Sequence, residues 1–316
     1  MRKLISVVTG CYNEEDNVEP LHARILEQFA RLPQYRYEHI WIDNASSDRT
    51  VERIKAIAAR EAHVRLIVNT RNFGHVRSPT YGLMQARGDA VISMASDLQD
   101  PPELIPEFIR HWEEGHMVVA GVKPKSMESS AMRLVRRFYY ATIVRISEVH
   151  LIRDFTGFGL YDRSVIEAVR RFDDPYPYFR GMIADIGFRH TEVPYVQQRR
   201  LHGKSKNSFY TLYDLAMLGV TSHSKVPLRV ATMAGFALSA VSLLVAIAYL
   251  AYKLLFWDQF TLGLAPLVIG VFFFASVQLF FIGVLGEYVG AIHTQVQRRP
   301  LVIEKERVNF DRDPGA

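Results

Sequence analysis

The chain has 316 residues, a net charge of +5 and one cysteine, enough length for one large domain or two small ones with a buried core. A single cysteine excludes an internal disulfide, and the absence of zinc-ligand spacing, an RNA-binding aromatic signature or a long basic run argues against nucleic-acid binding. The positive charge favours anionic partners such as phosphates or a lipid headgroup surface.

The first part of the chain alternates short apolar runs with amphipathic ones. The apolar run at 4–9 is too short for a signal peptide, so the N-terminus is expected to stay in the cytosol. Cys11 follows this run and is expected to be a buried, inert thiol rather than a nucleophile. Runs rich in β-branched or apolar residues predict strands at 4–9, 37–43, 64–68, 90–94 and 117–121.

Between these runs, apolar residues recur every three or four positions, which predicts helices. Asp48 is a plausible N-cap, and Pro101 suits a first turn. Alternating strands and helices predict an α/β fold, with a mostly parallel, doubly wound sheet and helices on both faces. The predicted helices span 16–31, 48–60, 75–87 and 101–114.

Two later stretches are amphipathic and lie closer to the apolar part of the chain. Residues 132–146 and 207–222 each place apolar side chains on one stripe. An ordinary surface helix is the alternative for both. Proximity to the first apolar span favours a position at the membrane interface for 207–222 only.

Residues 230–252 and 264–286 contain no charged side chain, and each is longer than the roughly 20 residues that cross a hydrocarbon core. They predict a transmembrane hairpin, with a buried helical hairpin of a soluble protein as the alternative. Basic residues flank the outer ends, so both termini are expected in the cytoplasm, although Lys253 near the loop weakens this bias. The flanking residues are Lys225, Arg229, Arg298 and Arg299, and the short loop contains Asp258.

Polar residues follow the predicted strands, where open parallel sheets bind ligands. Asp43, Asp97 and Gln99 have the chemistry to bind a nucleotide and a hard cation beside its diphosphate. For Asp43 a turn or capping role is the alternative. The polar segments are 10–15, 43–48, 69–74 and 95–103.

In these segments the sequence resembles the family 2 glycosyltransferases, and within them the polyprenyl-phosphate branch of bactoprenol glucosyltransferases and dolichyl-phosphate mannose synthases. The resemblance covers nearly the whole chain. The motifs are specific for this family when they occur together and in this order. They are Tyr12-Asn13-Glu14-Glu15, Asp43-Asn44-Ala45-Ser46-Ser47-Asp48, Asn72-Phe73-Gly74, Asp97-Leu98-Gln99-Asp100-Pro101-Pro102-Glu103, Phe155-Thr156-Gly157-Phe158, Arg200-Leu201-His202-Gly203-Lys204-Ser205-Lys206, Gly286-Glu287-Tyr288-Val289-Gly290 and Arg299-Pro300.

The resemblance implies a GT-A catalytic domain with a two-helix membrane anchor, often oligomeric, that uses Mg²⁺ or Mn²⁺ and inverts the anomeric centre. Asn13, Glu15 and Asp43 would contact the nucleoside. Asp97 and Gln99 would hold the cation and the donor diphosphate. The expected reaction moves a hexose, expected to be glucose, from a UDP-linked donor to undecaprenyl or dolichyl phosphate. It is expected to take place at the cell (inner) membrane and to supply cell-surface glycan or lipid modification.

On this basis the chain divides into four parts. These are a cytoplasmic GT-A domain at 1–206, a juxtamembrane amphipathic helix at 207–224, the transmembrane hairpin at 225–292 and a cytoplasmic C-terminal tail at 293–316.

The sequence departs from the family pattern at two positions. Ala95 replaces the first aspartate of the common Asp-x-Asp pair, and Gly157 stands where relatives have a proposed catalytic aspartate. Asp100 and Asp154 are the alternative carboxylates for a general base. A phosphate monoester has a second pKa near 6 and arrives mostly deprotonated, so a dedicated base contributes little to its attack.

Cations that hold the acceptor phosphate beside the donor diphosphate matter more than a base. Any one of the basic candidates is about as well explained as a solvated surface charge. Arg200, Ser205 and Lys206 stand out because their motif directly precedes the interfacial helix. The full candidate set is Lys123, Arg136, Arg137, Arg163, Arg200, Ser205 and Lys206.

Two other functions remain open. A processive polysaccharide synthase is one, but Gln197-Gln198-Arg199-Arg200 is followed by Leu201 rather than the tryptophan of that motif, and two spans cannot form a polymer pore alone. A non-catalytic membrane scaffold is the other, and the losses at positions 95 and 157 favour it. The histidines have no zinc-binding spacing.

Overall fold

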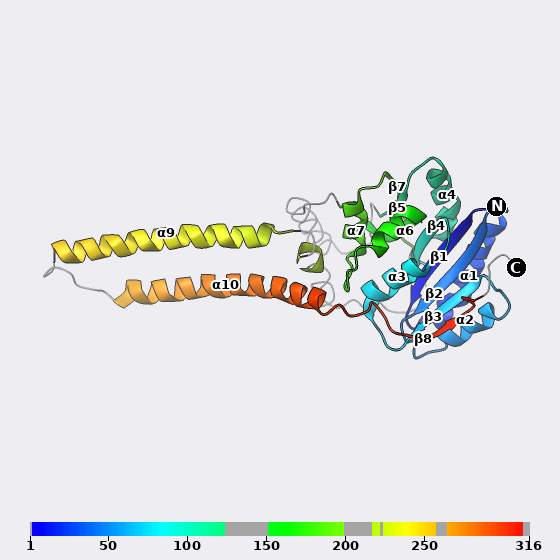
Figure 1. The fold of residues 1–316 in the computed structure, drawn as a ribbon, viewed down its shortest axis with the longest axis horizontal. Coiled ribbons are helices and arrows are strands. Elements are labelled where there is room, and N and C mark those ends of the chain that lie inside the picture. The colour runs from blue at the N-terminus through cyan, green and yellow to red at the C-terminus, as the bar shows by residue number, and fades with distance from the viewer. Residues whose placement is uncertain (1, 124–150, 199–216, 222–223, 257–263, 312–316) are drawn as a thin grey trace.

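A computed structural model describes residues 2–123, 151–198, 217–221, 224–256 and 264–311. Figure 1 shows an α/β domain and a pair of long helices that extend from one side of it. The predicted helix at 132–146 and most of the one at 207–222 lie outside the described residues, and 217–221 are helical.

The α/β domain is built on an eight-stranded sheet of order β7-β5-β6-β4-β1-β2-β3-β8. The four central strands β4, β1, β2 and β3 are parallel to one another, and β7 is parallel to β5. β6 runs antiparallel to β4 and β5, and β8 runs antiparallel to β3. The bounds are β1 (Leu4–Cys11), β2 (Arg36–Asp43), β3 (Val64–Asn69), β4 (Ala90–Ala95), β5 (Val118–Val122), β6 (Phe155–Asp162), β7 (His190–Pro194) and β8 (Glu304–Val308).

Helices cover both faces of the sheet, which confirms the predicted fold class. Because side chains alternate along a strand, Ile5 and Val7 of β1 pack into one core and Val8 packs into the other. The first core is covered by α1 (Glu15–Ala30), α2 (Thr50–Ala58), the 3₁₀ turn η1 (Pro102–Leu104) and α4 (Ile105–Glu113). The second is covered by α3 (Gly74–Gln85), α6 (Arg163–Arg170) and α7 (Phe179–Ile186).

The expected C-terminal tail is in part a strand of the sheet. β8 pairs along the edge of β3, where Lys55 Nζ lies 2.6 Å from a carboxylate oxygen of Glu306. Just before β8, the carbonyl oxygen of Ile303 accepts a 2.9 Å hydrogen bond from the backbone N–H of Thr70. Treating 293–316 as a separate tail was therefore wrong, because these contacts tie the chain after the second long helix back to the α/β domain.

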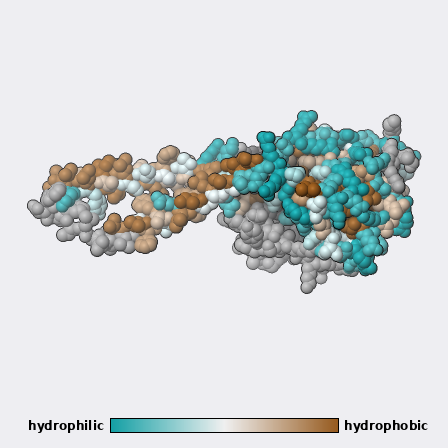
Figure 2. All heavy atoms as spheres, turned by 60° about the horizontal axis from the view of Figure 1, so that its bottom comes forward, coloured by the Kyte–Doolittle hydropathy of each residue, from teal (hydrophilic) through white to brown (hydrophobic). Residues whose placement is uncertain are grey.

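The helix pair consists of α9 (Val226–Leu255) and α10 (Leu264–Val296). Both are long and apolar enough to cross a membrane, and no residue in the most apolar 18-residue window of either helix is buried inside the protein. Figure 2 shows hydrophobic side chains on the outside of the pair. The two helices are therefore candidate membrane spans, and their exposed apolar windows do not fit the alternative of a helical hairpin buried in a soluble protein.

Candidate active site

The candidate active site lies at the carboxyl edge of the parallel strands. Cys11 at the end of β1 is opposite Asp43 at the end of β2. Gly10 is opposite Ala95, the last residue of β4. The chain passes from β1 to β2 and β3 on one side and returns to β4 on the other, which creates the switch point where open α/β sheets bind ligands.

This edge faces the helix pair. The N-terminus lies on the side of the domain remote from α9 and α10 (Figure 1). Because β1 begins near that end of the chain, its carboxyl end points toward the two apolar helices.

The loops that follow β1 and β2 hold each other in place. Asn13 has a positive φ of 56°, and its side-chain oxygen accepts a 2.8 Å hydrogen bond from the backbone N–H of Ser47. The backbone N–H of Asn13 donates to the hydroxyl of Ser46 at 2.8 Å. Ser46 in turn donates to the carboxylate of Asp43 through its hydroxyl and through its backbone N–H. Asn13 and Asp43 thus belong to one network.

Glu15 and Asp48 extend this network to the start of α2. The backbone N–H of Glu15 donates to Asp48 at 3.3 Å, and Arg49 donates to the carboxylate of Glu15 at 3.0 Å. Asp48 also accepts a 3.0 Å hydrogen bond from the backbone N–H of Thr50, which begins α2. The N-cap of α2 is Arg49, so the predicted N-cap role of Asp48 is wrong by one residue. Asp48 precedes the cap and accepts from the N–H of the first helical residue.

Burial controls the ionisation of the groups at this corner. Asp43 is fully buried, and burial raises the pKa of its carboxyl while the hydrogen bonds from Ser46 oppose the shift. Cys11 is also buried, and burial followed by the charge of Asp43 raises the pKa of its thiol well above the ordinary value. The thiol stays protonated at neutral pH and is unreactive, as expected.

The turn after β4 contains Asp97, Gln99 and Asp100. Leu98 has a positive φ of 60°, and the backbone N–H of Gln99 donates to Oδ1 of Asp97 at 3.2 Å. Oδ2 of Asp100 accepts a 3.1 Å hydrogen bond from the backbone N–H of Ala95. Burial raises the pKa of Asp100, and the positive charge of Lys123 opposes this shift. Both aspartates are more than nine-tenths buried, at 7% and 6% exposure.

Residues from β5, β6 and β7 complete the edge. The hydroxyl of Tyr195, just after β7, donates to Oδ1 of Asp100 at 2.7 Å, and Lys123 Nζ lies 5.8 Å from the centroid of the Tyr195 ring. The backbone N–H of Lys123 donates to the carbonyl of Asp154 at 3.1 Å. The side chain of Gln99 donates to the carbonyl of Gln198 at 3.3 Å. The fold therefore brings Lys123, Asp100 and Asp154 to the same edge as Asp97.

Sequence reasoning missed Tyr195. The short strand that positions it has a mixed, largely exposed pattern, and its partner Asp100 lies 95 residues earlier. The local sequence Val193-Pro194-Tyr195 has no motif that marks the tyrosine as part of a site.

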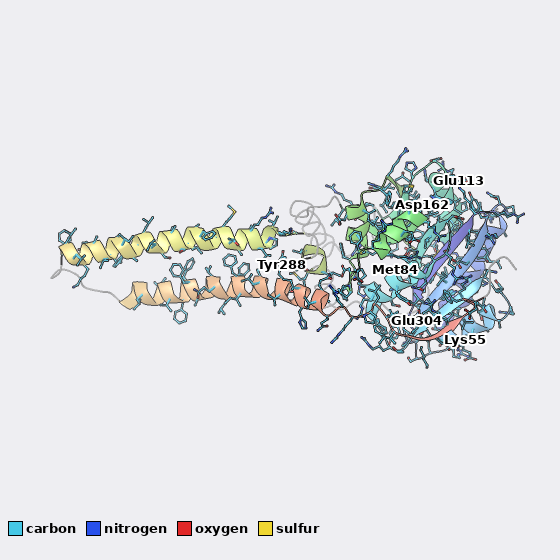
Figure 3. The ribbon with its side chains drawn as sticks, in the orientation of Figure 1. Lys55, Met84, Glu113, Asp162, Tyr288 and Glu304 are labelled. Atoms are coloured by element: carbon cyan, nitrogen blue, oxygen red, sulfur yellow. The ribbon has the colours of Figure 1, made fainter. Side chains whose placement is uncertain are left out.

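Arg163 does not fit its expected role. β6 runs antiparallel to β4, so Asp162 is opposite Ala90 at the beginning of β4. The backbone N–H of Arg163 donates to the carbonyl of Asp89, and its side chain donates to the carbonyl of Arg87. Figure 3 shows Asp162 across the domain from Glu304, which pairs with Asn69 at the carboxyl end of β3. Arg163 therefore lies at the opposite edge of the sheet. The remaining basic candidates, with Ser205, lie outside the described residues: Arg136, Arg137, Arg200, Ser205 and Lys206.

The two positions that depart from the family pattern both lie at this edge. Ala95 is exposed at the end of β4. Gly157 has a φ of +102°, and a Cβ added there would meet only the ring of Phe179, at 3.8 Å. Its positive φ disfavours any other residue, although there is space for a side chain.

The Asn72-Phe73-Gly74 motif is a scaffold for the third loop. Asn44 donates to Oδ1 of Asn72 at 2.9 Å and accepts a 2.8 Å hydrogen bond from the backbone N–H of Phe73. Oδ1 of Asn72 also accepts from the backbone N–H of Gly74, the first residue of α3. The amides thus link the ends of β2 and β3 to the beginning of α3.

A hard divalent cation fits the donor atoms at this edge. The Asp97 carboxylate and the Gln99 side-chain carbonyl offer oxygen ligands on one tight turn, the ligand type that Mg²⁺ and Mn²⁺ prefer. Within the described part of the chain, His111, Glu114 and His116 also form a group with metal-ligand chemistry. That group spans the end of α4 and the segment before β5, at the opposite edge, and does not belong to this site.

Comparisons with known proteins show what this chain is similar to. Residues 6–170 match the family model for glycosyl transferase family 2. The chain is 33% identical to an uncharacterised glycosyltransferase of Synechocystis over 300 residues, which cover 95% of this chain and 94% of the relative. It is 34% identical to a bactoprenol glucosyl transferase of Shigella phage SfII over 303 residues, covering 96% and 97%. A solved mannosyltransferase from Pyrobaculum calidifontis, in complex with GDP-Man and Mn²⁺, has a TM-score of 0.48 at 17% identity, covering 99% of this chain and 89% of that one.

Proposed function

The chain belongs to glycosyl transferase family 2 and has the GT-A fold, and on that premise we propose that it transfers a hexose from a nucleotide sugar to a polyprenyl phosphate at a membrane surface. The observation that carries the proposal is the orientation of the carboxyl edge. The edge with Asp97 and Asp43 faces two apolar helices (Figure 1), so a charged donor and a lipid acceptor meet at one place.

In this proposal the loops after β1 and β2 bind the nucleoside. Asn13 and Glu15 fix the loop that contains Ser46 and Asp48, so that both loops have one conformation before the donor arrives. Asp43, fully buried at the end of β2, offers an acceptor to the base or ribose hydroxyls. Preorganisation of this kind reduces the entropy lost on binding.

Asp97 and Gln99 hold a divalent cation and, through it, the donor diphosphate. The cation supplies Lewis-acid stabilisation of the leaving nucleoside diphosphate. Asp100 does not act as the base, because its two carboxylate oxygens accept hydrogen bonds from Ala95 and Tyr195 and its role is to hold the turn. The acceptor phosphate arrives deprotonated and needs cations more than a base.

Lys123 is the described basic residue that suits the acceptor phosphate. It follows β5 at the same edge, close enough for its positive charge to oppose the upward shift of the Asp100 pKa that burial causes. Charge from Lys123 reduces the repulsion between the donor diphosphate and the acceptor phosphate. The motif with Arg200, Ser205 and Lys206 is proposed to add further cationic contacts beside the membrane.

The product is proposed to be a polyprenyl-phosphate sugar, with glucose as the sugar and UDP as the nucleotide. The bactoprenol glucosyl transferase relative supports this choice by its name and by its match over nearly the whole chain. Inversion at the anomeric centre follows from direct attack by the acceptor phosphate on the donor. Both termini and the catalytic domain are proposed to lie on the cytoplasmic side, because basic residues flank the outer ends of the spans.

The test is sugar transfer in membranes that contain the protein. A panel of radiolabelled UDP- and GDP-sugars is incubated with undecaprenyl or dolichyl phosphate, and label entering the organic phase is counted. Label from UDP-glucose is expected to enter, and Asp97→Asn should abolish it. Asp16→Asn, which changes an exposed aspartate of α1, is the matched control and should retain activity. If no donor in the panel labels the lipid phase, the proposed function is wrong.

A further inference from the structure

A group of metal-ligand side chains lies at the end of α4, away from the candidate active site. His111 belongs to the last turn of α4, Glu114 is its C-cap, and His116 follows two residues later. One ligand atom of each lies within 4.8 Å of those of the other two. Nζ of Lys3, just before β1, lies 4.4 Å from the centroid of the Trp112 ring in the same turn, so the group is at the amino edge of the sheet. Figure 3 labels Glu113, the last residue of α4.

The end of α4 folds back so that His116 returns to His111. The backbone N–H of His116 donates to the carbonyl of His111 at 3.2 Å, and that of Gly115 donates to the carbonyl of Trp112 at 2.9 Å. Gly115 has a φ of 92°. These hydrogen bonds and the left-handed glycine form a Schellman motif, which fixes the spacing of the two histidines before any ligand binds. The sequence pattern missed this group, because the turn and not helical periodicity brings it together.

Hydrogen bonds orient both imidazole rings. Nδ1 of His116 lies 3.1 Å from the carbonyl oxygen of His111, which can only accept, so this nitrogen carries the proton and Nε2 keeps the lone pair that binds a metal. Nδ1 of His111 lies 2.9 Å from Oε2 of Glu114. The two ring centroids are 5.9 Å apart, with the rings at 85° to each other. A cation that replaces the proton between His111 and Glu114 therefore has a second imidazole within reach.

Arg110 already holds a positive charge against this group. Its Nη2 lies 3.3 Å from Nε2 of His111, and its Nη1 lies 3.4 Å from Oε1 of Glu114. A guanidinium only donates, so this contact requires the lone pair on Nε2 and the proton on Nδ1 of His111. The Arg110 side chain is 60% exposed and can turn into solvent. Arg110 and a metal ion therefore compete for the same two side chains.

We propose that His111, Glu114 and His116 bind Zn²⁺ at a site separate from that of the donor cation. Two imidazole nitrogens and one carboxylate are ligands that zinc prefers, whereas Mg²⁺ and Mn²⁺ favour oxygen. Ligand atoms of a tetrahedral zinc site lie about 3.3 Å apart. The exposed Glu114 and the two half-buried histidines reach this spacing by side-chain rotation, and water completes the shell. The ion ties α4 to the residues that enter β5 and stabilises the folded chain by mass action.

Zinc binding is measured by calorimetry on the full-length protein in detergent, purified without a histidine tag. Every variant is made in the Asp97→Asn background, because that change removes a ligand from the donor cation site and leaves this group intact. One equivalent of Zn²⁺ is expected to bind, at least about tenfold more tightly than Mn²⁺. Zinc should also raise the midpoint of thermal unfolding.

Three variants separate metal binding from ordinary surface charge. His116→Ala keeps the backbone bonds of the turn but loses a ligand, so zinc affinity should fall at least about tenfold and the thermal shift should vanish. Arg110→Ala removes the competing charge and should tighten zinc binding about two- to fivefold. His293→Ala, which removes an exposed histidine of α10, is the matched control and should change neither. Thermal unfolding without zinc checks that each variant is folded.

Three results would overturn this assignment. One is an Asp97→Asn protein that binds no zinc, and another is a folded His116→Ala variant that binds zinc as tightly as its parent. The third is weaker zinc binding in Arg110→Ala, because the guanidinium would then hold the group together rather than compete with the ion. Sugar transfer is assayed separately on the wild type, so failure of either the zinc site or the proposed function leaves the other standing.

Discussion

The hydroxyl of Tyr195 donates a 2.7 Å hydrogen bond to Oδ1 of Asp100, linking the end of β7 to the turn after β4. The other carboxylate oxygen of Asp100 accepts from the backbone N–H of Ala95. Asp100 is thus fully engaged within the protein. Its partners hold the turn that carries Asp97 and Gln99, so a carboxylate that the sequence offered as a base is a positioning residue.

Tyr195→Phe should reduce the free energy of unfolding by about 1–2 kcal/mol, because it leaves a buried carboxylate oxygen without its donor. Thermal denaturation of the purified protein measures the change. A double-mutant cycle with Asp100→Ala provides the control, since the effect of Tyr195→Phe should largely vanish in that background. Equal effects in both backgrounds would show that the hydrogen bond contributes nothing.

The raised pKa of Asp100 predicts a pH dependence of stability. Burial raises this pKa in the folded state, so the folded protein binds the proton more tightly than the unfolded chain. The resulting stabilisation is complete below the unfolded value of about 3.9 and is lost as pH rises through the folded value. Compared with Asp100→Asn, the wild type should gain stability as pH falls from neutrality toward the unfolded value of about 3.9. A stability difference that stays constant down to that pH would contradict the assignment.

Asn13 combines a left-handed backbone with a side-chain hydrogen bond, and two substitutions separate these contributions. Asn13→Gly keeps the positive φ but loses the bond to the backbone N–H of Ser47. Asn13→Ala loses both, so it should be less stable than Asn13→Gly by about 1 kcal/mol. Both should weaken nucleotide binding, measured by calorimetry with UDP. Equal stability of the two variants would mean that the backbone conformation is not strained.

Asp97→Asn should weaken Mn²⁺-dependent UDP binding by about tenfold to a hundredfold, because the amide is a poorer metal ligand than the carboxylate. Calorimetric titration with UDP, with and without Mn²⁺, measures this directly. Gln99→Ala should show a smaller effect in the same direction, and Asp16→Asn should show none. UDP binding that is indifferent to Mn²⁺ in the wild type would favour the scaffold alternative.

The proposed topology is testable because the sole cysteine is unreactive. Cys11 is buried at 4% exposure, and burial raises the pKa of its thiol, so a maleimide reagent should not label the wild type. Gln259→Cys, between the spans, should be labelled in intact cells. Lys305→Cys in β8 is exposed and should be labelled only after lysis. The reverse pattern would place the catalytic domain outside.

The sequence predicted the parallel half of the sheet well. β1 to β5 and α1 to α4 were expected close to their observed bounds, because buried strands are continuously apolar and β-branched and the helices between them have clear periodicity. β6, β7 and β8 were missed. Gly157 and Gly159 interrupt the apolar run of β6, whereas β7 and β8 are short and half exposed and β8 is almost entirely charged, so none of the three has a clear strand pattern.

The candidate site was predicted only in part, because sequence patterns report local structure and some of its contacts are long-range. Local motifs identify which residues follow a parallel strand, so Asp43 and Asp97 were expected at one edge. They do not reveal that β6 runs the other way, which moves Arg163 to the opposite edge. Nor do they pair Tyr195 with Asp100, because that contact depends on β5, β6 and β7 being assembled.

The position of β8 also sets an order of events during biosynthesis. This strand completes the side of the sheet next to β3, yet it is translated after α9 and α10. Until β8 has been synthesised, the outer edge of β3 is unpaired and can form hydrogen bonds with non-native strands. The α/β domain therefore reaches its finished form only after both long helices have been synthesised, and a chain that ends before them lacks the strand that pairs with β3.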